Sequence, residues 1–591
     1  MAPILFLLLL EIGLTVAGFG RPATFFVSSG KKGMLTTNHW YVWFYRPTRT
    51  TSPHPCLIQT PKPNDTIRLF VLGESAAIGT PKPAFNFGRV LELMLQDRFP
   101  RHRVEVINAA MRGIDSHIVA SISAECARLQ PDLFVVYMGN NEVIGQYGPT
   151  TFLGRHPGLI GVLHRMMATR VAQCLRVAVA RVASGAEKAG SSETMESFRR
   201  NRVALDDSRR EATYRNYRRN LTRICDHAVA AGAGVVVATI PVNLKDCPPL
   251  ASLHRRDLTA EQLETWESLY NRAAQNETEQ RYAEAIAGYR EALAIDDHDA
   301  DLHYRLARCH LALGDQEAAR THFSLARDWD ALQFRTDSAL NDIIREVASA
   351  RADKKVHLVD AAGRLAPDSP DPNGIPGQEL FNDHVHCNFD GDYRLVRLLL
   401  PAVVEALQRD RGVVAAEPSD IPTRDQCAAR LAFTAWEEVD TLAAVAKMLA
   451  RPPFLDQIDH APRQAALEKR VSEMNGRIDQ AFVDGAVKAY DDAIALNPSD
   501  WALHYNYANF LYQLQRYGQA TPHIRYVADM FPGVPAFHVL FGYCLAGSGH
   551  LDQSIEQFRL ARRLDKHSKP IKEALAWAEQ RKRDLTQETR N

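Results

Sequence analysis

The stretch that decides the fold is Thr66-Ile67-Arg68-Leu69-Phe70-Val71-Leu72, which runs directly into Gly73-Glu74-Ser75. A short apolar run that ends at a glycine is typical of a buried strand in a parallel sheet. Similar runs follow at 104–108, 132–138, 234–240 and 355–359, and helical patterns lie at 87–99, 115–129, 211–232 and 390–408. Alternating strands and helices build right-handed βαβ units. The sequence therefore predicts an α/β domain with a doubly wound, parallel, five-stranded sheet.

Polar residues and glycines follow the end of each predicted strand. In a doubly wound sheet, ligands bind outside the carboxyl ends of the strands. A candidate site is therefore expected at this edge of the sheet. Its residues, in strand order, are Ser75; Arg112 and Gly113; Gly139, Asn140, Asn141 and Glu142; Asn243 and Asp246; and Asp383 and His386.

Three of these residues are the types that acyl transfer needs. A serine hydroxyl becomes a nucleophile when an adjacent base takes its proton, and an aspartate orients that base and stabilises its charged form. Ser75 and the pair Asp383-x-x-His386 supply these groups, about 310 positions apart in the sequence. Only the fold can bring them together.

With these residues in place, the chain resembles the SGNH, or GDSL-type, hydrolase family. The blocks that carry the resemblance come in the family's order, over roughly residues 66–145, 234–250 and 330–408. They are Gly73-Glu74-Ser75, the glycine Gly113 in Asn108-Ala109-Ala110-Met111-Arg112-Gly113, Gly139-Asn140-Asn141-Glu142, and Asp383-His384-Val385-His386. The resemblance implies a flavodoxin-like sheet, a serine esterase activity and no cofactor. Glu142 departs from the family, which has an aspartate there.

The resemblance also implies a role for each matching residue. Ser75 would be the nucleophile, His386 the general base and then the general acid, and Asp383 the residue that orients the imidazole. The oxyanion would be bound by the backbone N–H groups of Ser75 and Gly113 and by the Asn141 side chain. Preorganised donors of this kind contribute about 3 kcal/mol each to transition-state stabilisation.

The same residues allow other interpretations. Ser75 alone would be a strand-end serine that caps the next turn. Asp383-His384-Val385-His386-Cys387 offers metal ligands within five residues, but there is no second dense ligand cluster, and a metal would leave Ser75 and Asn141 unexplained. The loop after Gly73 lacks the spacing of a phosphate-binding loop, and Ala77 stands where a lipase elbow has glycine. We therefore expect no metal.

Two further residues are candidates for substrate binding. Arg335 precedes the helix that leads to the fifth strand, where it would pair with an anionic substrate group or pack as a structural arginine. Asn243, with Asp246, would form part of the pocket wall or ordinary loop structure.

A period of 34 residues marks helical repeats of the tetratricopeptide (TPR) type. A repeat at 300–333 has Ala307, Ala319, Phe323 and Ala326 at the packing positions, and a preceding one starts near 266. Three more repeats are expected at 467–500, 501–534 and 535–568, followed by a polar capping helix. The first helix of the 467–500 repeat is the weakest match, because Met474 stands where a small residue is expected.

These patterns divide the chain into six parts. Residues 1–25 are expected to be a membrane anchor or signal segment, 26–250 and 334–410 the two parts of the hydrolase domain, 251–333 the inserted repeats, 411–466 a linker and helical segment, and 467–591 the C-terminal repeats and cap. Residues 149–210 look like a basic surface excursion with a flexible middle, and 411–425 like a linker. Glu11 interrupts the apolar N-terminus, and Arg21, Lys31 and Lys32 follow it, an order that does not favour export.

The amino-acid composition limits the classes of partner that the chain is expected to bind. The 70 Lys and Arg balance the 70 Asp and Glu, which argues against nucleic acid, and nine cysteines without a C-x-x-C pair argue against a disulfide framework. The predicted function is hydrolysis of an O-acyl ester, such as an acetylated glycan or another small acyl ester, with a protein or peptide partner on the repeats and a membrane at the N-terminus. The alternatives are an O-acyltransferase of the same fold and a TPR scaffold whose α/β domain is not catalytic.

Overall fold

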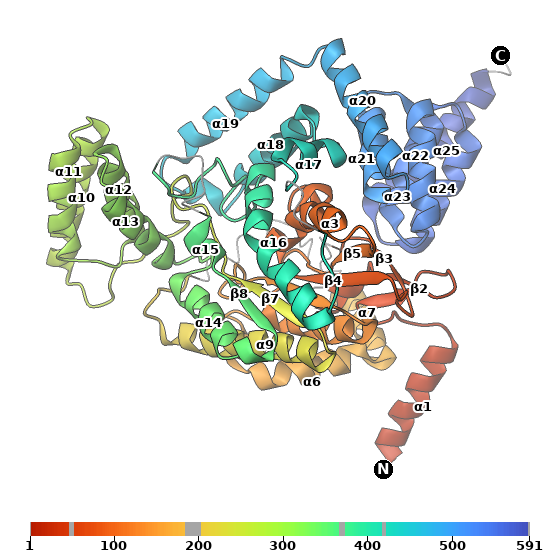
Figure 1. Cartoon of the computed structure of the whole chain (residues 1–591), viewed down its shortest axis with the longest axis horizontal. Coiled ribbons are helices and arrows are strands. Elements are labelled where there is room, and N and C mark those ends of the chain that lie inside the picture. Colours follow the sequence, from red (N-terminus) through yellow and green to blue (C-terminus); the bar gives the residue numbers. More distant parts are fainter. Residues whose placement is uncertain (1, 46–51, 184–201, 366–372, 417–420, 589–591) are drawn as a thin grey trace.

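The computed structural model describes residues 2–45, 52–183, 202–365, 373–416 and 421–588 of the 591-residue chain (Figure 1). A central α/β domain carries one group of helical repeats on one side and a second group on the other.

The central sheet has five parallel strands in the order β5-β4-β6-β7-β8. Val71 in the middle of β4 pairs with Asn108 of β5 on one side and with Val135 of β6 on the other. All five predicted strands are present and the sheet is parallel, as expected. The strands are β4 (Thr66–Gly73), β5 (Arg103–Asn108), β6 (Leu133–Tyr137), β7 (Gly234–Ala238) and β8 (Val356–Val359).

Helices cover both faces of this sheet. On one face α3 (Phe87–Arg98) packs against α16 (Phe389–Arg411), and on the other α9 (Ser208–Ala230) packs against α4 (Ser116–Cys126) and α14 (Ser338–Ser349). β4 and β6 are buried along their whole length because helices lie on both sides. Two short helices, α2 (Ser75–Ile78) and α15 (Ala361–Arg364), follow the ends of β4 and β8.

A second, antiparallel sheet was not predicted. It consists of β1 (Phe26–Ser28), β2 (Met34–Thr37) and β3 (Leu57–Gln59), in that order. The strands are three or four residues long, and β3 pairs with a strand twenty residues earlier, so no local pattern marks them. Phe25, Phe26 and Ile58 join the core of the α/β domain, and the small sheet is therefore part of that domain.

Two repeats are inserted between β7 and β8, as expected. Their helices are α10 (Ala260–Thr278), α11 (Tyr282–Leu293), α12 (Ala300–Ala312) and α13 (Gln316–Asp328), which pack in consecutive pairs. Ala273, Ala285, Tyr289 and Ala292 are fully buried, as the 34-residue pattern predicts.

The C-terminal array consists of α20 (Gln480–Leu496), α21 (Trp501–Gln513), α22 (Tyr517–Met530), α23 (Pro535–Gly547), α24 (Leu551–Leu564) and the capping helix α25 (Lys569–Glu588). Its first repeat differs from the prediction. α19 (His460–Asn475) has no buried residue and packs on α18 (Ala435–Leu449), not along α20. The polar sequence around Met474 offers no small-residue seam for α20, so the array begins with a single helix.

Residues 149–210 and 411–425, which have no clear sequence pattern, contain more helix than expected. α5 (Phe152–Arg155), α6 (Pro157–Ala168) and α7 (Arg170–Ala183) occupy the predicted excursion, whose expected flexible middle, 184–201, lies outside the described residues. α17 (Arg424–Arg430) begins at the end of the predicted linker. At the N-terminus, α1 (Ala2–Val16) is followed by a loop, and among the described helices none is long and apolar enough to cross a membrane.

Candidate active site

The strand order places the predicted site residues at one point of the sheet. β4 lies between β5 and β6, so the chain leaves β4 toward β5 on one side and reaches β6 on the other. In an open α/β sheet the crevice for a ligand lies where the strand order reverses, here between β4 and β6. Ser75 follows β4, and Asn141 follows β6.

Ser75 is the first residue of the short helix α2, and tight packing fixes the turn before it. A side chain on Gly73 would come within 2.0 Å of the Tyr137 carbonyl oxygen at the end of β6, so only glycine fits where the two strands are this close. The Asn108 amide at the end of β5 donates to the Ala77 carbonyl at 2.8 Å. The Ser75 side chain itself is only partly buried. The turn is rigid while its serine remains accessible.

The two other residues of the predicted oxyanion hole, Gly113 and Asn141, are linked by a hydrogen bond to the residue that follows Gly113. Gly113 has a positive φ of 68°, the left-handed conformation that favours glycine. Asn141 Nδ2 donates to the carbonyl of Ile114, the next residue, at 2.9 Å. This bond uses one of the two N–H groups of the Asn141 amide. The loops after β5 and β6 are thereby joined at the position of the predicted donors.

A pair of buried glutamates, Glu74 and Glu142, lies beneath these loops, and no sequence motif assigns Glu74 a role. Glu74 Oε2 accepts the backbone N–H groups of Asn140 at 2.9 Å and Asn141 at 3.2 Å. Glu142 accepts the backbone N–H of Ser116 at 2.8 Å and its hydroxyl at 2.7 Å. Glu74 therefore ties the nucleophile turn to the Asn141 loop, and Glu142 ties that loop to α4.

Both glutamates favour the protonated form. Burial raises the pKa of Glu74 first, and the neighbouring Glu142 raises it further. Burial also raises the pKa of Glu142, followed by the charge of Asp115, although hydrogen bonds with Ser116 and Glu74 oppose this. Glu74 Oε1 has no donor among the described groups. A proton held between the two carboxyl groups would satisfy that oxygen. The sequence signal for the role of Glu74 is an acidic residue at the end of a buried strand, β4.

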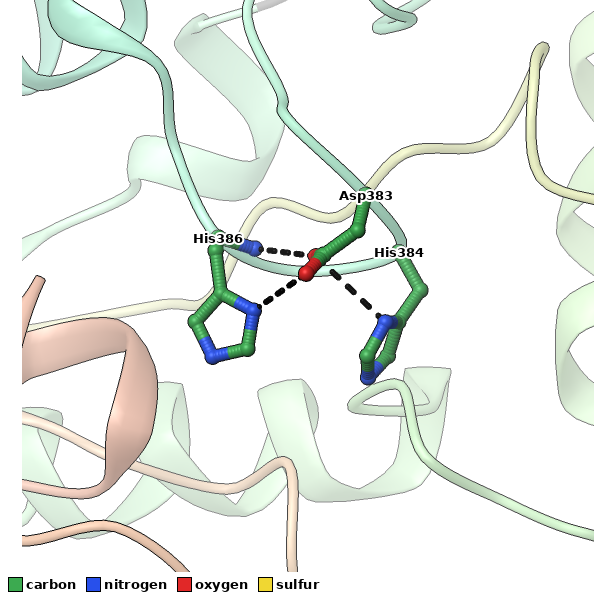
Figure 2. A group of neighbouring side chains, drawn as sticks. All are labelled: Asp383, His384 and His386. Carbon is green, nitrogen blue, oxygen red and sulfur yellow. Dashed lines mark hydrogen bonds and ion pairs between the residues drawn. The ribbon is translucent and has the colours of Figure 1, made fainter. Parts of the chain in front are cut away.

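Asp383 and His386 form a direct pair (Figure 2). His386 Nδ1 lies 2.6 Å from Asp383 Oδ2, and Asp383 Oδ1 accepts the backbone N–H groups of Val385 and His386 at 2.9 Å each. Burial alone would raise the pKa of Asp383, but its interactions with His386 and His384 outweigh burial and lower that pKa. An ionised Asp383 requires a proton on Nδ1 of His386. His386 Nε2 is then the basic nitrogen; it is buried and has no partner among the described residues.

Asp383, His384 and His386 are also the group that the described residues offer as metal ligands. The two rings lie on the same side of the loop with the carboxylate between them (Figure 2), and His384 Nδ1 is 3.4 Å from Asp383 Oδ1. Asp383 already accepts three N–H groups, and no fourth ligand joins the group in the described part of the chain. Burial lowers the pKa of His384 to about 4. These contacts are those of a histidine–aspartate pair.

Asn243 and Arg335 hold the loops near Asp383. The Asn243 side chain donates to the Asp383 carbonyl at 3.0 Å, its backbone N–H donates to the His384 carbonyl at 3.0 Å, and its Oδ1 accepts the backbone N–H of Asp246. Arg335 is 3 % exposed and donates to the carbonyls of Asn243 and Cys247. The contacts of Arg335 are those of the structural arginine that the sequence also allowed.

A cavity of about 1270 Å³ opens beside the site. On one side it is lined by Gly79 and Thr80, which follow α2, and on the other by Asn243, Asp383 and His384. Its outer walls come from the inserted repeats (Tyr304, Arg308, Leu311, Phe323) and from α18 and α19 (Glu438, Thr441, Leu442, Arg463, Leu467, Arg470). The helical insertion therefore forms part of the wall around the candidate site.

The structure unites the predicted residues in two clusters. Ser75, Gly113 and Asn141 form one through Glu74 and Ile114, and Asp383, His386 and Asn243 form the other. Asp383 and Asn243 of the second cluster line the cavity directly, and on the side of the first cluster it is lined by Gly79 and Thr80, which follow the Ser75 helix. Within the described residues, no hydrogen bond joins Ser75 Oγ to His386 Nε2.

Comparisons with known proteins identify the repeats. Two tetratricopeptide repeat family models match residues 278–340 and 475–535. This confirms the predicted repeats, the kind of helical array whose extended concave surface binds partners. No curated protein matches the chain.

Solved structures resemble the chain only distantly. MamA 41-end from Desulfovibrio magneticus RS-1 has 18% identity and a TM-score of 0.17, covering 26% of this chain and 89% of its own. The assembly chaperone of RpL4, Acl4, has 14% identity and a TM-score of 0.22, covering 55% and 99%. TesA has 12% identity and a TM-score of 0.25, covering 57% and 99%. TM-scores this low support no inference about fold or function.

Proposed function

We propose that this protein is a serine-dependent ester hydrolase of the SGNH type that acts on an O-acyl ester. The observation that carries the proposal is the pair of Asp383 and His386, 2.6 Å apart, which leaves the buried Nε2 of His386 without a partner. A structural histidine would be expected to use both ring nitrogens, because an unpaired buried polar atom is costly. Ser75, the proposed nucleophile, is only partly buried and follows the end of β4.

In this proposal, His386 Nε2 takes the proton of Ser75 Oγ as the oxygen forms a bond to the acyl carbon. The N–H groups of Ser75, Gly113 and Asn141 stabilise the oxyanion. His386 then gives its proton to the leaving alcohol, and the acyl group stays on Ser75. A water molecule then attacks the acyl carbon as His386 takes its proton; the bond between the acyl carbon and Ser75 Oγ breaks, His386 returns the proton to Oγ, and the carboxylic acid leaves. Asp383 keeps the ring in one tautomer throughout.

The lining of the cavity supports the proposed substrate class. Its walls carry both charged side chains and apolar ones such as Tyr304, Phe323 and Phe454, a mixed lining that suits an acetylated glycan or another small acyl ester. A second alcohol held in the same space would accept the acyl group in place of water. The acyltransferase reaction thus differs from hydrolysis only in the acceptor.

The nucleophile is tested by comparing the full-length protein with Ser75→Ala on p-nitrophenyl acetate. We expect kcat to fall at least 10³-fold, as is typical when a catalytic serine is lost. Ser324→Ala, whose hydroxyl bonds only to the Arg320 carbonyl of its own helix, is the matched control and should keep full activity. Equal rates for the wild type and Ser75→Ala would refute the proposal and leave the α/β domain with a structural role.

A second function, protein binding by the repeats, has its own support in the two matched family segments. A groove of about 620 Å³ lies between the C-terminal array and the loop after α2. Trp501, Tyr505, Asn506, Asn509 and Phe537 line it, and the Asn506 Nδ2 atom is buried without a partner. Peptides selected from a display library on the full chain should lose binding to Asn506→Ala/Asn509→Ala. Peptides that bind this variant equally well would place partner binding elsewhere.

A further inference from the structure

Exposed apolar side chains are concentrated on one group of helices. Most of the strongly exposed large apolar residues in the described chain lie in α1 and α5–α7. On α6, Leu159, Val162 and Met166 are 46–58% exposed and share one face by their spacing of three and four residues. The others are Leu5, Phe6, Leu7, Leu8, Leu9, Leu10, Ile12, Val16, Phe152, Leu175 and Val179.

Glu11, the one acidic residue of α1, binds the N-terminus of α7. Its carboxylate accepts the backbone N–H groups of Arg170 at 2.7 Å and Val171 at 2.9 Å, the first two residues of α7. These amides have no partner inside their own helix, and the positive end of the helix dipole favours a carboxylate. Glu11 therefore joins α1 to α7, and α7 in turn packs on α6. The apolar residues of the three helices belong to one connected unit; in Figure 1, α6 lies along the lower edge of the molecule and α1 projects at the lower right.

The same unit is basic. Residues 149–179 contain Arg155, Arg165, Arg170 and Arg176 and no aspartate or glutamate, in a chain whose charges otherwise balance. Trp43 adjoins it, and the Arg176 guanidinium lies 4.3 Å from the ring centre of Trp43. Exposed apolar residues flanked by arginines and a tryptophan match the chemistry of a bilayer surface that carries anionic head groups.

We propose that α1, α6 and α7 form a membrane-docking surface that binds bilayers with anionic phospholipids. The apolar side chains enter the boundary between head groups and acyl chains, and the exposed Arg155 and Arg165 contact the phosphates. This goes beyond an N-terminal anchor, because the α6–α7 hairpin contributes binding of its own.

The docking surface is connected to the candidate active site. His164 of α6 is 2.6 Å from the Tyr147 hydroxyl, and the Tyr147 backbone N–H donates to Asp115 in the loop after Gly113. The hairpin is therefore held by the same loops that carry the predicted oxyanion donors. Docking would fix the orientation of the site relative to the bilayer.

The proposal is tested by vesicle flotation with the full-length protein. Vesicles of phosphatidylcholine alone are compared with vesicles containing 30 mol% phosphatidylglycerol, at low and high salt. Leu159→Ser/Val162→Ser/Met166→Ser removes the apolar face of α6, and Arg155→Gln/Arg165→Gln removes exposed charge. The controls are Leu313→Ser/Leu496→Ser and Arg562→Gln/Arg563→Gln, which replace exposed apolar residues and exposed arginines on the repeats. Far-UV circular dichroism confirms that each variant is folded.

We expect the wild type to prefer the anionic vesicles at least tenfold and to lose this preference in high salt. Both hairpin variants should bind the anionic vesicles at least tenfold more weakly, and both controls should bind normally. If neither the hairpin substitutions nor high salt weakens vesicle binding, the proposal is overturned, and α1 alone is responsible for the binding. If neither the wild type nor any variant binds vesicles, and the wild type instead forms a dimer that the α6 variant abolishes, the occupant of the surface is a second copy of the chain. Because Ser75 is untouched, the hydrolysis test stands independently of these results.

Discussion

Asp383 is the residue on which the candidate chemistry depends most at the scale of single side chains. It accepts three N–H groups, two from its own backbone turn and one from His386. The first two fix the carboxylate, so the third sets the tautomer of the ring. A change at Asp383 that keeps the shape of the side chain should therefore act on the chemistry and leave the fold intact.

The first prediction concerns Asp383→Asn. An amide at this position would present an N–H group to His386 Nδ1, so the proton would move to Nε2 and the ring could no longer act as a base. We expect kcat on p-nitrophenyl acetate to fall about 10³- to 10⁴-fold, with KM changed by less than about threefold. His384→Asn is the control, because its ring only adjoins Asp383, and it should lower kcat less than tenfold. Equal losses in both variants, with bound zinc lost as well, would favour a metal site.

The second residue-scale prediction concerns the buried pair of Glu74 and Glu142. Since folding raises the pKa of both groups, their stabilisation is complete below the pKa of the unfolded carboxyl, about 4.3, and is lost as the pH rises toward the higher folded value. Glu142→Gln keeps the shape and cannot ionise. Urea unfolding of this variant should show a smaller loss of stability between pH 5 and 8 than the wild type. The exposed Glu264→Gln should match the wild type, and an unchanged slope in Glu142→Gln would show that the pair is ionised in the folded state.

At the scale of elements, the repeats share a histidine clamp. In three repeats a histidine on the first helix bonds through Nε2 to the carbonyl six residues earlier, and its Nδ1 meets a residue nineteen positions later on the second helix. The pairs are His303 with His322 at 3.1 Å, His504 with His523 at 2.8 Å, and His538 with Gln557 at 2.8 Å. Because a carbonyl only accepts, Nε2 of His303 and of His504 carries the proton, and His322 and His523 must donate to the Nδ1 atoms. The third repeat differs, because the atom that meets His538 Nδ1 is the amide oxygen of Gln557, which only accepts.

This clamp predicts acid sensitivity in two of the three repeats. Burial, followed by the neighbouring ring, lowers the pKa of His322 and of His523 to about 4. Neutral histidines therefore stabilise the repeats fully above the unfolded pKa of about 6.5, and this stability is lost as the pH falls toward 4. We expect a loss of about 1–2 kcal/mol per pair, discounted because the rings are partly exposed.

The variants that test the clamp copy the third repeat. His322→Gln and His523→Gln should each reduce the loss of stability between pH 6.5 and 4, measured by urea unfolding followed by circular dichroism. His550→Gln, a histidine outside the clamps, is the control. A pH dependence that survives in the double variant would mean that other groups cause it.

The elements show which parts of the fold a sequence can predict. Some elements are marked by local signals in the sequence. Continuous apolar runs such as β4 and β6 correctly predicted the strands, and the 34-residue period correctly predicted the repeats. β1–β3 were missed because three-residue strands depend on pairing with distant partners. α19 was misassigned because the repeat spacing continued across a helix with no buried face.

The candidate site was predictable to a similar degree. Its residues follow strand ends, which the sequence marks, and Asp383 with His386 is a local motif. The role of Glu74 could not be predicted, because it depends on β4 and β6 being neighbours and on the pairing of Glu74 with Glu142, 68 positions later. The structural use of Arg335 depends likewise on two carbonyls that lie about ninety residues before it.

At the scale of the whole molecule, charged contacts dock the C-terminal array onto the α/β domain. Lys82, in the loop that follows α2, pairs with the buried Glu437 and with Asp440 of α18, and Glu437 also accepts the Tyr490 hydroxyl of α20. Arg89 of α3 pairs with Asp500 at the start of α21. The first contact touches the loop of the candidate nucleophile, and the second does not. The array is therefore connected to the candidate site through Lys82.

The last prediction separates docking from activity. Glu437→Gln and Asp500→Asn should each lower the free energy of unfolding by about 1–3 kcal/mol, less than a fully buried pair, because Lys82 retains Asp440 and Arg89 retains Glu92. Asp492→Asn, which breaks the exposed pair with Lys488, should change it by less than about 0.5 kcal/mol. Only Glu437→Gln should also slow hydrolysis of p-nitrophenyl acetate, because only this change releases the loop after Ser75. If Asp500→Asn slows hydrolysis equally, the array affects the site through its position as a whole, and Lys82 is not the specific link.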